Sequence, residues 1–521
     1  MANFANFTQK HHRLRRFFPH KLRFLLRFLA FHVHPFFIQL CYFGILSLFG
    51  YLALKNSNPR SPGRPKDFDL FYTSVSASTV SSMVAVEMEA FSNSQLILLT
   101  FLMFVGGEVF TSMLDLLFAR YKLTQSVRNR DSTNPFSPTA EKPPVHDNHV
   151  ELGLISIPHS QPENHNPSND SYRLKYNCLT YLTYIVLGYF VVVQLVGFSS
   201  VSLYMTLVPS ATKVLKNKDI KISTFSLFII VSTFASCGFV PTNENMMVFK
   251  KNSGLLLLIL PHVFLGNTLY PPCLRAVIMG LRKVSRREEF SHLLKNFKDI
   301  GYDHMLSGLQ CCFLVATVLC LNVIQFVMFW SVEWKTKTME GLNFYEKVVG
   351  SLFQVTNARH AGESVFDLSS MSSAILVVFV VMMYLPPYTT FLPVREEEDD
   401  AKRKRKSAVE CVVFSQLSYL AIFIILVCMT ESKSLKEDPL NFNVLSITLE
   451  VIRQGTAYGN VGFSMGYSCA RQLKGDGSCK DSWVGFSGRW SNKGKFVLML
   501  VMFFGRLKKF NMKGGKSWIL S

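Results

Sequence analysis

Four short apolar stretches of this chain each end in a polar turn with a glycine or a serine at a matching place. The turns contain TVSSM, ASCGF, HAGES and NVGFS, and the matching residues are Ser82, Gly238, Gly362 and Gly462. Glycine permits backbone conformations that turn carbonyl oxygens to one side, which other L-residues resist. Carbonyl oxygens arranged around an axis replace the hydration shell of a cation. The set predicts a cation filter, although any one glycine alone is more typical of an ordinary turn, and Ser82 alone of a turn-capping hydroxyl.

The composition of the chain places these turns in a membrane. Of 521 residues, 55 are Lys or Arg and 35 are Asp or Glu, so the net charge is +20. Charged residues make up 17% of the chain, 46 residues are Phe, and the mean hydropathy is +0.22. A disordered chain would be poorer in aromatic residues, and one soluble domain could not cover so many apolar stretches. We expect a polytopic membrane protein in a lipid bilayer, with basic residues in loops beside the spans and no nucleic-acid partner.

Eight apolar spans are long enough to cross the bilayer. They lie near residues 35–54, 94–118, 178–208, 253–281, 310–330, 371–394, 411–429 and 494–511. Between the members of each successive pair lies one of the four short stretches, at 68–82, 222–238, 344–362 and 442–462. These stretches are too short to cross and too apolar for solvated loops, which is typical of re-entrant segments. The pattern predicts four diverged copies of one unit around a central axis.

The predicted fold is an all-α membrane protein with eight transmembrane helices in four membrane–pore–membrane repeats around a central pore. Repeats A to D are expected at residues 35–118, 178–281, 310–394 and 411–511. The positive-inside rule makes the connectors cytoplasmic, together with both termini; these segments are 1–34, 119–177, 282–309, 395–410 and 512–521. Segment 211–222 departs from the rule because it holds four Lys. It is either a basic outer vestibule or a sign that the boundary of repeat B is misplaced.

Longer stretches resemble a known family. DFDLFYTSVSASTVSSM, STFASCGFVPTNEN, GSLFQVTNARHAGE, AYGNVGF and GRWSNKGKFVLMLVMFFGR are similar to the plant high-affinity potassium transporter (HKT) family of the Trk/Ktr/HKT superfamily. The resemblance implies four units around one permeation path, with sodium held at Ser82, Gly238, Gly362 and Gly462. Serine at the first position resembles the sodium-selective subclass. One side chain in a ring of glycines narrows one quadrant, which disfavours the larger potassium ion.

The resemblance also implies a physiological role. It indicates channel-like sodium uniport across the plant plasma membrane, sodium retrieval and salt tolerance, and a chain that can pair as a homodimer. A potassium transporter or sodium–potassium symporter of the same fold stays open as an alternative, and a membrane-embedded enzyme is a more remote one. An enzyme would need converging carboxylates or histidines within the spans, and the few ionisable groups there form no such set. No phosphate loop or HExxH motif occurs, so we expect neither enzymatic activity nor a cofactor.

Several further residues are candidates for a role in permeation. Arg506 is predicted to lie near the axis below the filter, where its charge would limit flux; the alternative is an arginine that snorkels to the interface. Polar side chains after the turns could form an outer vestibule that concentrates cations, or could be solvated turn residues. They are Glu87, Glu89, Asn243, Glu244 and Glu363. Cys469 and Cys479 flank a polar, glycine-rich loop and could form an extracytoplasmic disulfide.

The fourth unit departs from the family pattern. In the family, EVI runs into AYGNVGF with little between them, whereas here Arg453, Gln454, Gly455 and Thr456 intervene. Glycine disfavours a helix, and an arginine that faces lipid is costly. The insertion is compatible with a bulge, a natural variant or a misread gene boundary. It bears directly on the fourth pore helix and on transport.

Overall fold

The computed structural model describes residues 35–60, 64–133, 169–385, 388–390, 416–455, 462–472 and 485–511, with Cys479, Asp481 and Ser482. Within these ranges the chain is helical, and its β-type pairing is an isolated bridge between Tyr467 and Ser482. The predicted cytoplasmic segments 1–34, 395–410 and 512–521, much of 119–177, and Thr456 lie outside the described residues. The all-α fold class is confirmed.

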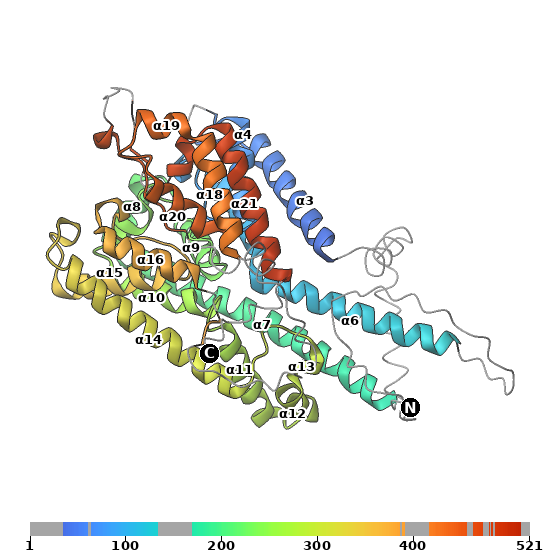
Figure 1. Ribbon diagram of the computed structural model, residues 1–521. Helices are drawn as coiled ribbons and strands as arrows, with labels where there is room; N and C mark the ends of the chain where they lie inside the picture. The colour runs from blue at the N-terminus through green and yellow to red at the C-terminus, as the bar shows by residue number, and fades with distance from the viewer. Residues whose placement is uncertain are drawn as a thin grey trace, which may run out of the picture.

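Each unit contains the predicted order of apolar helix, short helix and apolar helix (Figure 1). Unit A comprises α3 (Pro35–Asn56), α4 (Asp67–Ser78), α5 (Asn93–Gly106) and α6 (Glu108–Thr133). Unit B comprises α7 (Asn169–Leu207), α8 (Pro209–Asn217), α9 (Ile222–Phe234), α10 (Ser253–Leu265) and α11 (Tyr270–Ser285). Helices α12 (Glu288–Lys295) and α13 (Phe297–Ile300) connect it to unit C.

Units C and D repeat the arrangement. Unit C comprises α14 (Gly308–Glu333), α15 (Phe344–Asn357) and α16 (Ser373–Tyr384). Unit D comprises α18 (Gln416–Thr430), α19 (Ser432–Glu437), α20 (Val444–Gly455) and α21 (Asn492–Asn511). Short 3₁₀ turns lie at Met88–Ala90, Asn245–Phe249, Lys337–Met339, Leu368–Ser370, Cys469–Arg471 and Phe486–Arg489. The four predicted re-entrant stretches therefore contain the short helices α4, α9, α15 and α20, which we call the pore helices.

Two of the predicted spans are bent helix pairs. In the described ranges, α3, α7 and α14 are each long and apolar enough to cross a membrane alone. Helices α5 and α6 meet at a bend of 50°, and α10 and α11 at a bend of 82°. The described parts of α16 and α18 are shorter apolar helices. Each of the eight predicted spans thus coincides with a helix or with a bent pair.

Glycine explains where the bent pairs break. A Cβ on Gly106, the last residue of α5, would lie 2.0 Å from the carbonyl oxygen of Ser78, the last residue of pore helix α4. A Cβ on Gly266, just after α10, would lie 1.9 Å from the carbonyl oxygen of Phe234, the last residue of pore helix α9. Both glycines let the second span of a unit touch the backbone of its own pore helix. The same contact in units A and B identifies them as copies.

The apolar cores join the units into a closed ring. One core packs Phe228 and Val231 of unit B against unit A, and a second joins units B and C. A third core packs Tyr72 and Val75 of unit A against unit D. The ring closes between units C and D, where α16 contacts α20. Figure 1 shows α21 beside α3 and α4, so the last unit lies against the first although hundreds of residues separate them in sequence.

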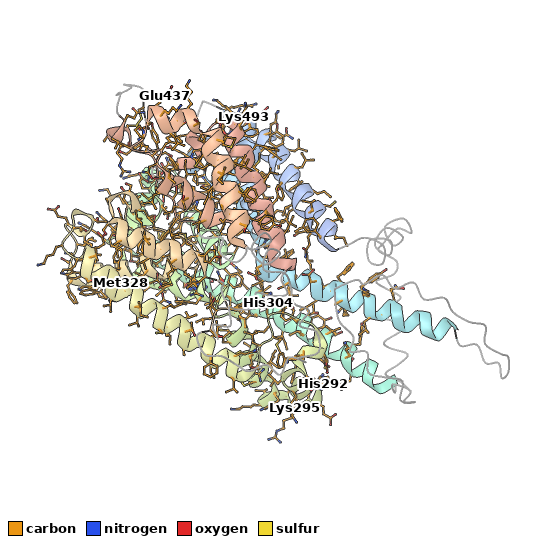
Figure 2. All side chains as sticks on the ribbon, viewed as in Figure 1. His292, Lys295, His304, Met328, Glu437 and Lys493 are labelled. Atoms are coloured by element: carbon orange, nitrogen blue, oxygen red, sulfur yellow. A yellow bond between two sulfur atoms is a disulfide. The ribbon has the colours of Figure 1, made fainter. Side chains whose placement is uncertain are left out.

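The outside of the ring is apolar, and its ends are polar. On α3 and α14, Ile45, Leu319, Val323 and Val327 are each more than half exposed. Such a surface suits lipid, not water. In Figure 2, Met328 lies on this outer face of α14, whereas Glu437 and Lys493 lie at one end of the molecule and His292 and Lys295 at the other. The arrangement leaves the pore helices in the interior, with their ends near the centre of the ring.

Candidate functional site

The turns after the first three pore helices adopt a backbone conformation that glycine favours. The φ angles are 58° at Ser82, 77° at Gly238 and 89° at Gly362. Two residues earlier, Val80 and Ser236 also have positive φ values, of 58° and 59°. A residue other than glycine in this region costs about 1–3 kcal/mol and persists only where its surroundings enforce it. The turns of units A and B therefore share one strained backbone pattern.

Each of these turns begins with the same hydrogen bond. The amide N–H of one turn residue donates to the carbonyl oxygen five positions earlier, close to the end of the pore helix. The bonds run from Ser81 to Ser76 (2.8 Å), from Cys237 to Ser232 (2.8 Å) and from Gly362 to Asn357 (3.0 Å). Ser82 and Gly238 lie four residues beyond the last residues of α4 and α9, whereas Gly362 lies five beyond the end of α15. The turn of unit C therefore differs in register, because Gly362 itself donates this bond, whereas in units A and B the residue before Ser82 or Gly238 donates it.

The four predicted filter residues lie together. A Cβ on Gly462 would lie 2.5 Å from Ser82 Oγ, and one on Gly362 would lie 1.8 Å from the Gly462 nitrogen. A Cβ on Gly238 would lie 2.1 Å from the carbonyl oxygen of Ala361 and 3.2 Å from Gly462 Cα. The Gly462 N–H donates to that Ala361 oxygen at 2.9 Å. At Gly238 and Gly362 any side chain would collide with the backbone of a neighbouring unit, and at Gly462 it would collide with the side chain of Ser82.

Arg506 links the last helix to unit A. Its side chain is buried, its Nη2 donates to the carbonyl oxygen of Gly106, and its guanidinium lies over the ring of Phe43 at 5.4 Å. Because Gly106 also touches the end of pore helix α4, Arg506 lies one contact away from that helix. An arginine that snorkels to an interface keeps its charged head in water, and this buried head does not.

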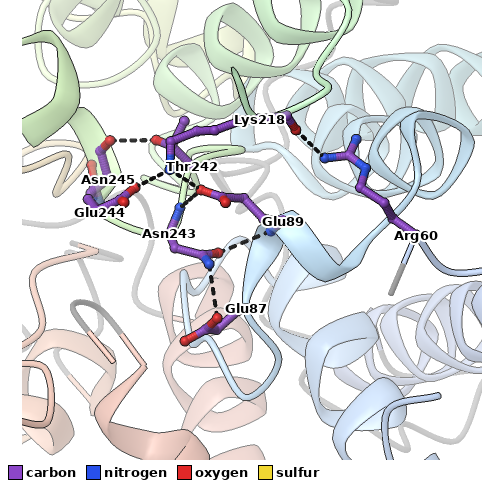
Figure 3. Close-up of polar contacts among 8 residues, drawn as sticks. All are labelled: Arg60, Glu87, Glu89, Lys218, Thr242, Asn243, Glu244 and Asn245. Atoms are coloured by element: carbon purple, nitrogen blue, oxygen red, sulfur yellow. Dashed lines mark hydrogen bonds and ion pairs between the residues drawn. The ribbon is translucent and has the colours of Figure 1, made fainter. Parts of the chain in front are cut away.

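Four of the polar residues predicted after the turns join units A and B (Figure 3). The Glu89 N–H donates to Asn243 Oδ1 at 3.1 Å, and the Asn243 N–H donates back to Glu89 Oε1 at 2.9 Å. Asn243 Nδ2 also donates to Glu87 at 2.9 Å. Lys218 Nζ binds Glu89 at 2.5 Å and Glu244 at 2.6 Å. One ammonium group thus offsets two of the acids.

Lys218 is one of the four Lys of segment 211–222, and it pairs with acids instead of facing solvent alone. It follows α8, and its carbonyl oxygen accepts a hydrogen bond from Arg60 Nη1 of unit A at 2.7 Å. Burial lowers the pKa of Lys218, but the hydrogen bonds and charges of the two carboxylates outweigh it, so the pKa is raised above 10.5. We call Arg60, Glu87, Glu89, Lys218, Asn243 and Glu244 the Lys218 cluster. Arg60 and Lys218 were not predicted, because their partners lie 26 to 158 residues away in the sequence.

Glu363 and Asn245 connect units B and C beside the filter turns. Glu363 is fully buried and accepts a hydrogen bond from Thr233 Oγ1 of pore helix α9. Its second oxygen, Oε2, has no hydrogen-bond partner among the described residues. Asn245 Oδ1 accepts from the N–H of Ser364 at 3.1 Å. Glu363 therefore lies deeper than the other acids, in the wall of the filter region.

Cys469 and Cys479 of unit D are bonded to each other. Cys469 and Cys479 form a disulfide with Cα atoms 5.9 Å apart. The bridge closes a short loop next to the isolated β-bridge between Tyr467 and Ser482, and Asp481 accepts a hydrogen bond from the Cys469 N–H.

Comparisons with known proteins agree with this architecture. Residues 163–512 match the family TrkH, described as "Cation transport protein". The chain is 46% identical over 504 residues to "Cation transporter HKT1;3" of Oryza sativa subsp. japonica, which covers 94% of this chain and 92% of that protein. It is 48% identical over 485 residues to "Sodium transporter HKT1" of Arabidopsis thaliana, with 90% and 92% covered.

A solved structure shares the fold. The structure of the potassium transporter TrkH from Vibrio parahaemolyticus aligns with a TM-score of 0.50 at 14% identity and covers 92% of this chain and 83% of that one. The fold and the relatives define a multi-pass membrane transporter for cations, and not an enzyme. The chain belongs to the HKT family within the TrkH superfamily of cation transport proteins.

Proposed function

We propose that this chain is a sodium-selective uniporter whose filter is formed by Ser82, Gly238, Gly362 and Gly462. The observation that carries the proposal is the position of Ser82. It occupies the place that glycine holds in the other turns, and its Oγ lies 2.5 Å from where a Cβ of Gly462 would be. The serine side chain fills space that the ring of glycines leaves open. A narrower ring favours sodium over the larger potassium ion.

The buried acidic side chain of Glu363 supports a cation as the transported species. Glu363 Oε2 is buried beside the turns with no hydrogen-bond partner among the described residues. A buried carboxylate oxygen is costly unless a cation or a donor satisfies it. The Arabidopsis relative is named a sodium transporter, which favours the same ion. We assign Glu87, Glu89, Asn243 and Glu244 to an outer vestibule and Arg506 to a constriction below the filter.

The cellular assignment completes the proposal. We place the protein in the plant plasma membrane, with both termini in the cytoplasm, repeats A to D at the predicted boundaries and sodium retrieval as its role in salt tolerance. An inside-negative potential supplies about 2.3 kcal/mol per charge per 100 mV for inward sodium movement. A homodimer would place two such pathways side by side.

Isotope uptake tests the proposed ion. Yeast cells that lack their own sodium and potassium transporters would express the full chain, and uptake of radioactive sodium would be measured with and without an excess of potassium. We expect uptake that a potassium excess lowers by less than about twofold. The Ser82→Gly variant is expected to lose this discrimination, and Ser92→Gly, an N-cap change outside the filter, is the matched control. Equal competition by potassium in the unmodified chain would assign the protein to potassium transport instead.

A further inference from the structure

A buried arginine contacts the filter. Arg453, near the end of pore helix α20, is the largest of the fully buried side chains in the described residues. Its Nη1 donates to the carbonyl oxygen of Gly462 at 2.8 Å, and its Nη2 lies 2.8 Å from Sδ of Met83, the residue after Ser82. Its Nε lies 2.7 Å from Glu450 Oε2. One guanidinium therefore joins the filter turns of units A and D.

These contacts occupy oxygens that a filter needs. A filter holds a cation by carbonyl oxygens that replace its water ligands. The Gly462 oxygen already accepts from Arg453, and the Ala361 oxygen next to Gly362 already accepts from the Gly462 N–H at 2.9 Å. Both oxygens are thus engaged by the protein itself. By contrast, Gly238 and Ser82 make no such bond to unit D in the described residues.

Glu450 offsets the charge of Arg453 at only one edge of the guanidinium. Glu450 pairs with the Nε edge of the guanidinium and also accepts a hydrogen bond from Ser464 Oγ at 2.5 Å. The Nη1 edge meets Gly462. A cation at Gly462 would therefore meet the positive edge of the arginine before the carboxylate that neutralises it. At such short range and in a water-poor site, like charges repel strongly.

We propose that Arg453 is a fixed internal cation of the filter, which binds the Gly462 carbonyl oxygen in place of a permeating ion and keeps the flux through this chain low. The inference rests on the proposed function, because it needs Gly462 to line the pathway. It concerns the amplitude of transport, whereas the identity of Ser82 concerns the choice of ion. The two therefore have separate readouts.

The direction of the effect distinguishes this role from a structural one. An arginine that only neutralises Glu450 would, when removed, leave a buried unpaired charge and lower both folding and current. A filter-blocking arginine would, when removed together with that charge, raise the current. The informative variant is therefore Glu450→Gln combined with Arg453→Met, which removes both charges and nearly conserves volume.

The test uses the full chain in frog oocytes under voltage clamp, with surface protein quantified by biotinylation. At equal surface density, the double variant is expected to carry a sodium current about tenfold larger than the unmodified chain. Arg453→Lys keeps the charge, so its current is expected to stay low. Arg275→Met is the matched control, because Arg275 also donates to a backbone carbonyl oxygen, that of Leu306, away from the filter.

Each outcome decides one of the two proposals. A current in the double variant that is no larger than that of the unmodified chain overturns the role of Arg453 and leaves sodium selectivity untouched. A larger current in the double variant supports the role of Arg453, and a current of the unmodified chain that does not discriminate sodium from potassium overturns the proposed ion. The absence of any cation movement in both proteins, at normal surface density, overturns both. If that double variant does not reach the surface, Glu450→Gln combined with Arg453→Gln, which also removes both charges, is judged by the same comparison.

Discussion

Units A and B are close copies around the filter, whereas units C and D are not. In A and B the turns share two positive φ values at the same spacing, the second span breaks at a glycine against the pore helix, and the Lys218 cluster joins the two units. In C the corresponding hydrogen bond is donated by Gly362 itself, and not by the residue before it. In D the Gly462 N–H is bonded to unit C and its carbonyl oxygen to Arg453. Units A and B therefore keep the same local structure around the candidate filter, and units C and D differ from it.

The difference shows where sequence change is tolerated. The contacts between A and B are made by backbone atoms and charged pairs that each need their partner, so a change in one unit is felt in the other. At Gly462 of unit D, the hydrogen bonds come from the Arg453 side chain and from the Ala361 carbonyl oxygen of unit C, so the geometry there depends on both. Substitutions at the contacts between units A and B should therefore have a different kind of effect from substitutions in unit D.

The largest expected effect is at the tight contact between C and D. Gly362→Ala would place its Cβ 1.8 Å from the Gly462 nitrogen, at a φ of 89°. We expect transport to fall by roughly a hundredfold or the chain to be lost from the surface, since backbone cannot move away from backbone. Sodium uptake and surface biotinylation measure this.

Gly341→Ala is the control for that variant. Gly341 has a similar φ of 75°, but nothing lies within 4 Å of its Cβ position. Its substitution carries only conformational strain, so uptake should change by less than about twofold. If both variants behave alike, the close approach of Gly362 and Gly462 is not required for transport.

The next-largest expected effect tests whether units A and B are copies of one repeat. Gly106→Ala and Gly266→Ala would each put a Cβ about 2 Å from a pore-helix carbonyl oxygen. Both should lower the yield of folded protein in detergent by a similar, severalfold amount. Gly44→Ala and Gly188→Ala are the controls, since their Cβ positions are open and alanine favours a helix. Unequal responses at Gly106 and Gly266 would break the equivalence of the two units.

A smaller effect is expected at the Lys218 cluster. Lys218→Met removes the ammonium between Glu89 and Glu244 and should lower the thermal inactivation temperature of the solubilised protein by a few degrees, corresponding to about 1–3 kcal/mol. The exposed pair Lys433–Glu437 supplies the control. Lys433→Met should lower the stability of the solubilised protein by less than about 1 kcal/mol. A response no greater than that of the control would show that the cluster does not hold units A and B together.

The pH dependence of that variant has a definite sign. The folded-state pKa of Lys218 lies above its ordinary value of 10.5. The stabilisation is therefore fully present below pH 10.5 and is lost as the pH rises through the folded pKa. The difference in inactivation temperature between the unmodified chain and Lys218→Met should stay constant from neutral pH to pH 9 and shrink in more alkaline buffer. A difference that shrinks already below pH 9 would contradict the assigned pairing.

The helices and turns could be predicted from the sequence more fully than the contacts between them. Long apolar spans and the turns at Ser82, Gly238, Gly362 and Gly462 were visible because hydrophobicity and glycine are local signals. The breaks after α5 and α10 were not predicted, because they depend on how Gly106 and Gly266 meet another helix. Lys218 looked anomalous in sequence because its partners lie far away in the chain.

The fourth unit shows the same limit. The sequence marked Arg453 as costly if it faced lipid, but could not show that the side chain turns inward. Its partners Gly462 and Met83 lie 9 and 370 residues away, and the second distance is beyond any local pattern. The disulfide partners were visible as a pair because they flank one short loop.

The central claim is that Ser82 narrows one corner of a ring formed by four turns and thereby selects sodium. The most direct measurement is the reversal potential of the current with sodium on one side and potassium on the other, for the unmodified chain and for Ser82→Gly. We expect a reversal potential close to that of sodium for the unmodified chain and a shift toward potassium of tens of millivolts for the variant. Identical reversal potentials for the two proteins would contradict it.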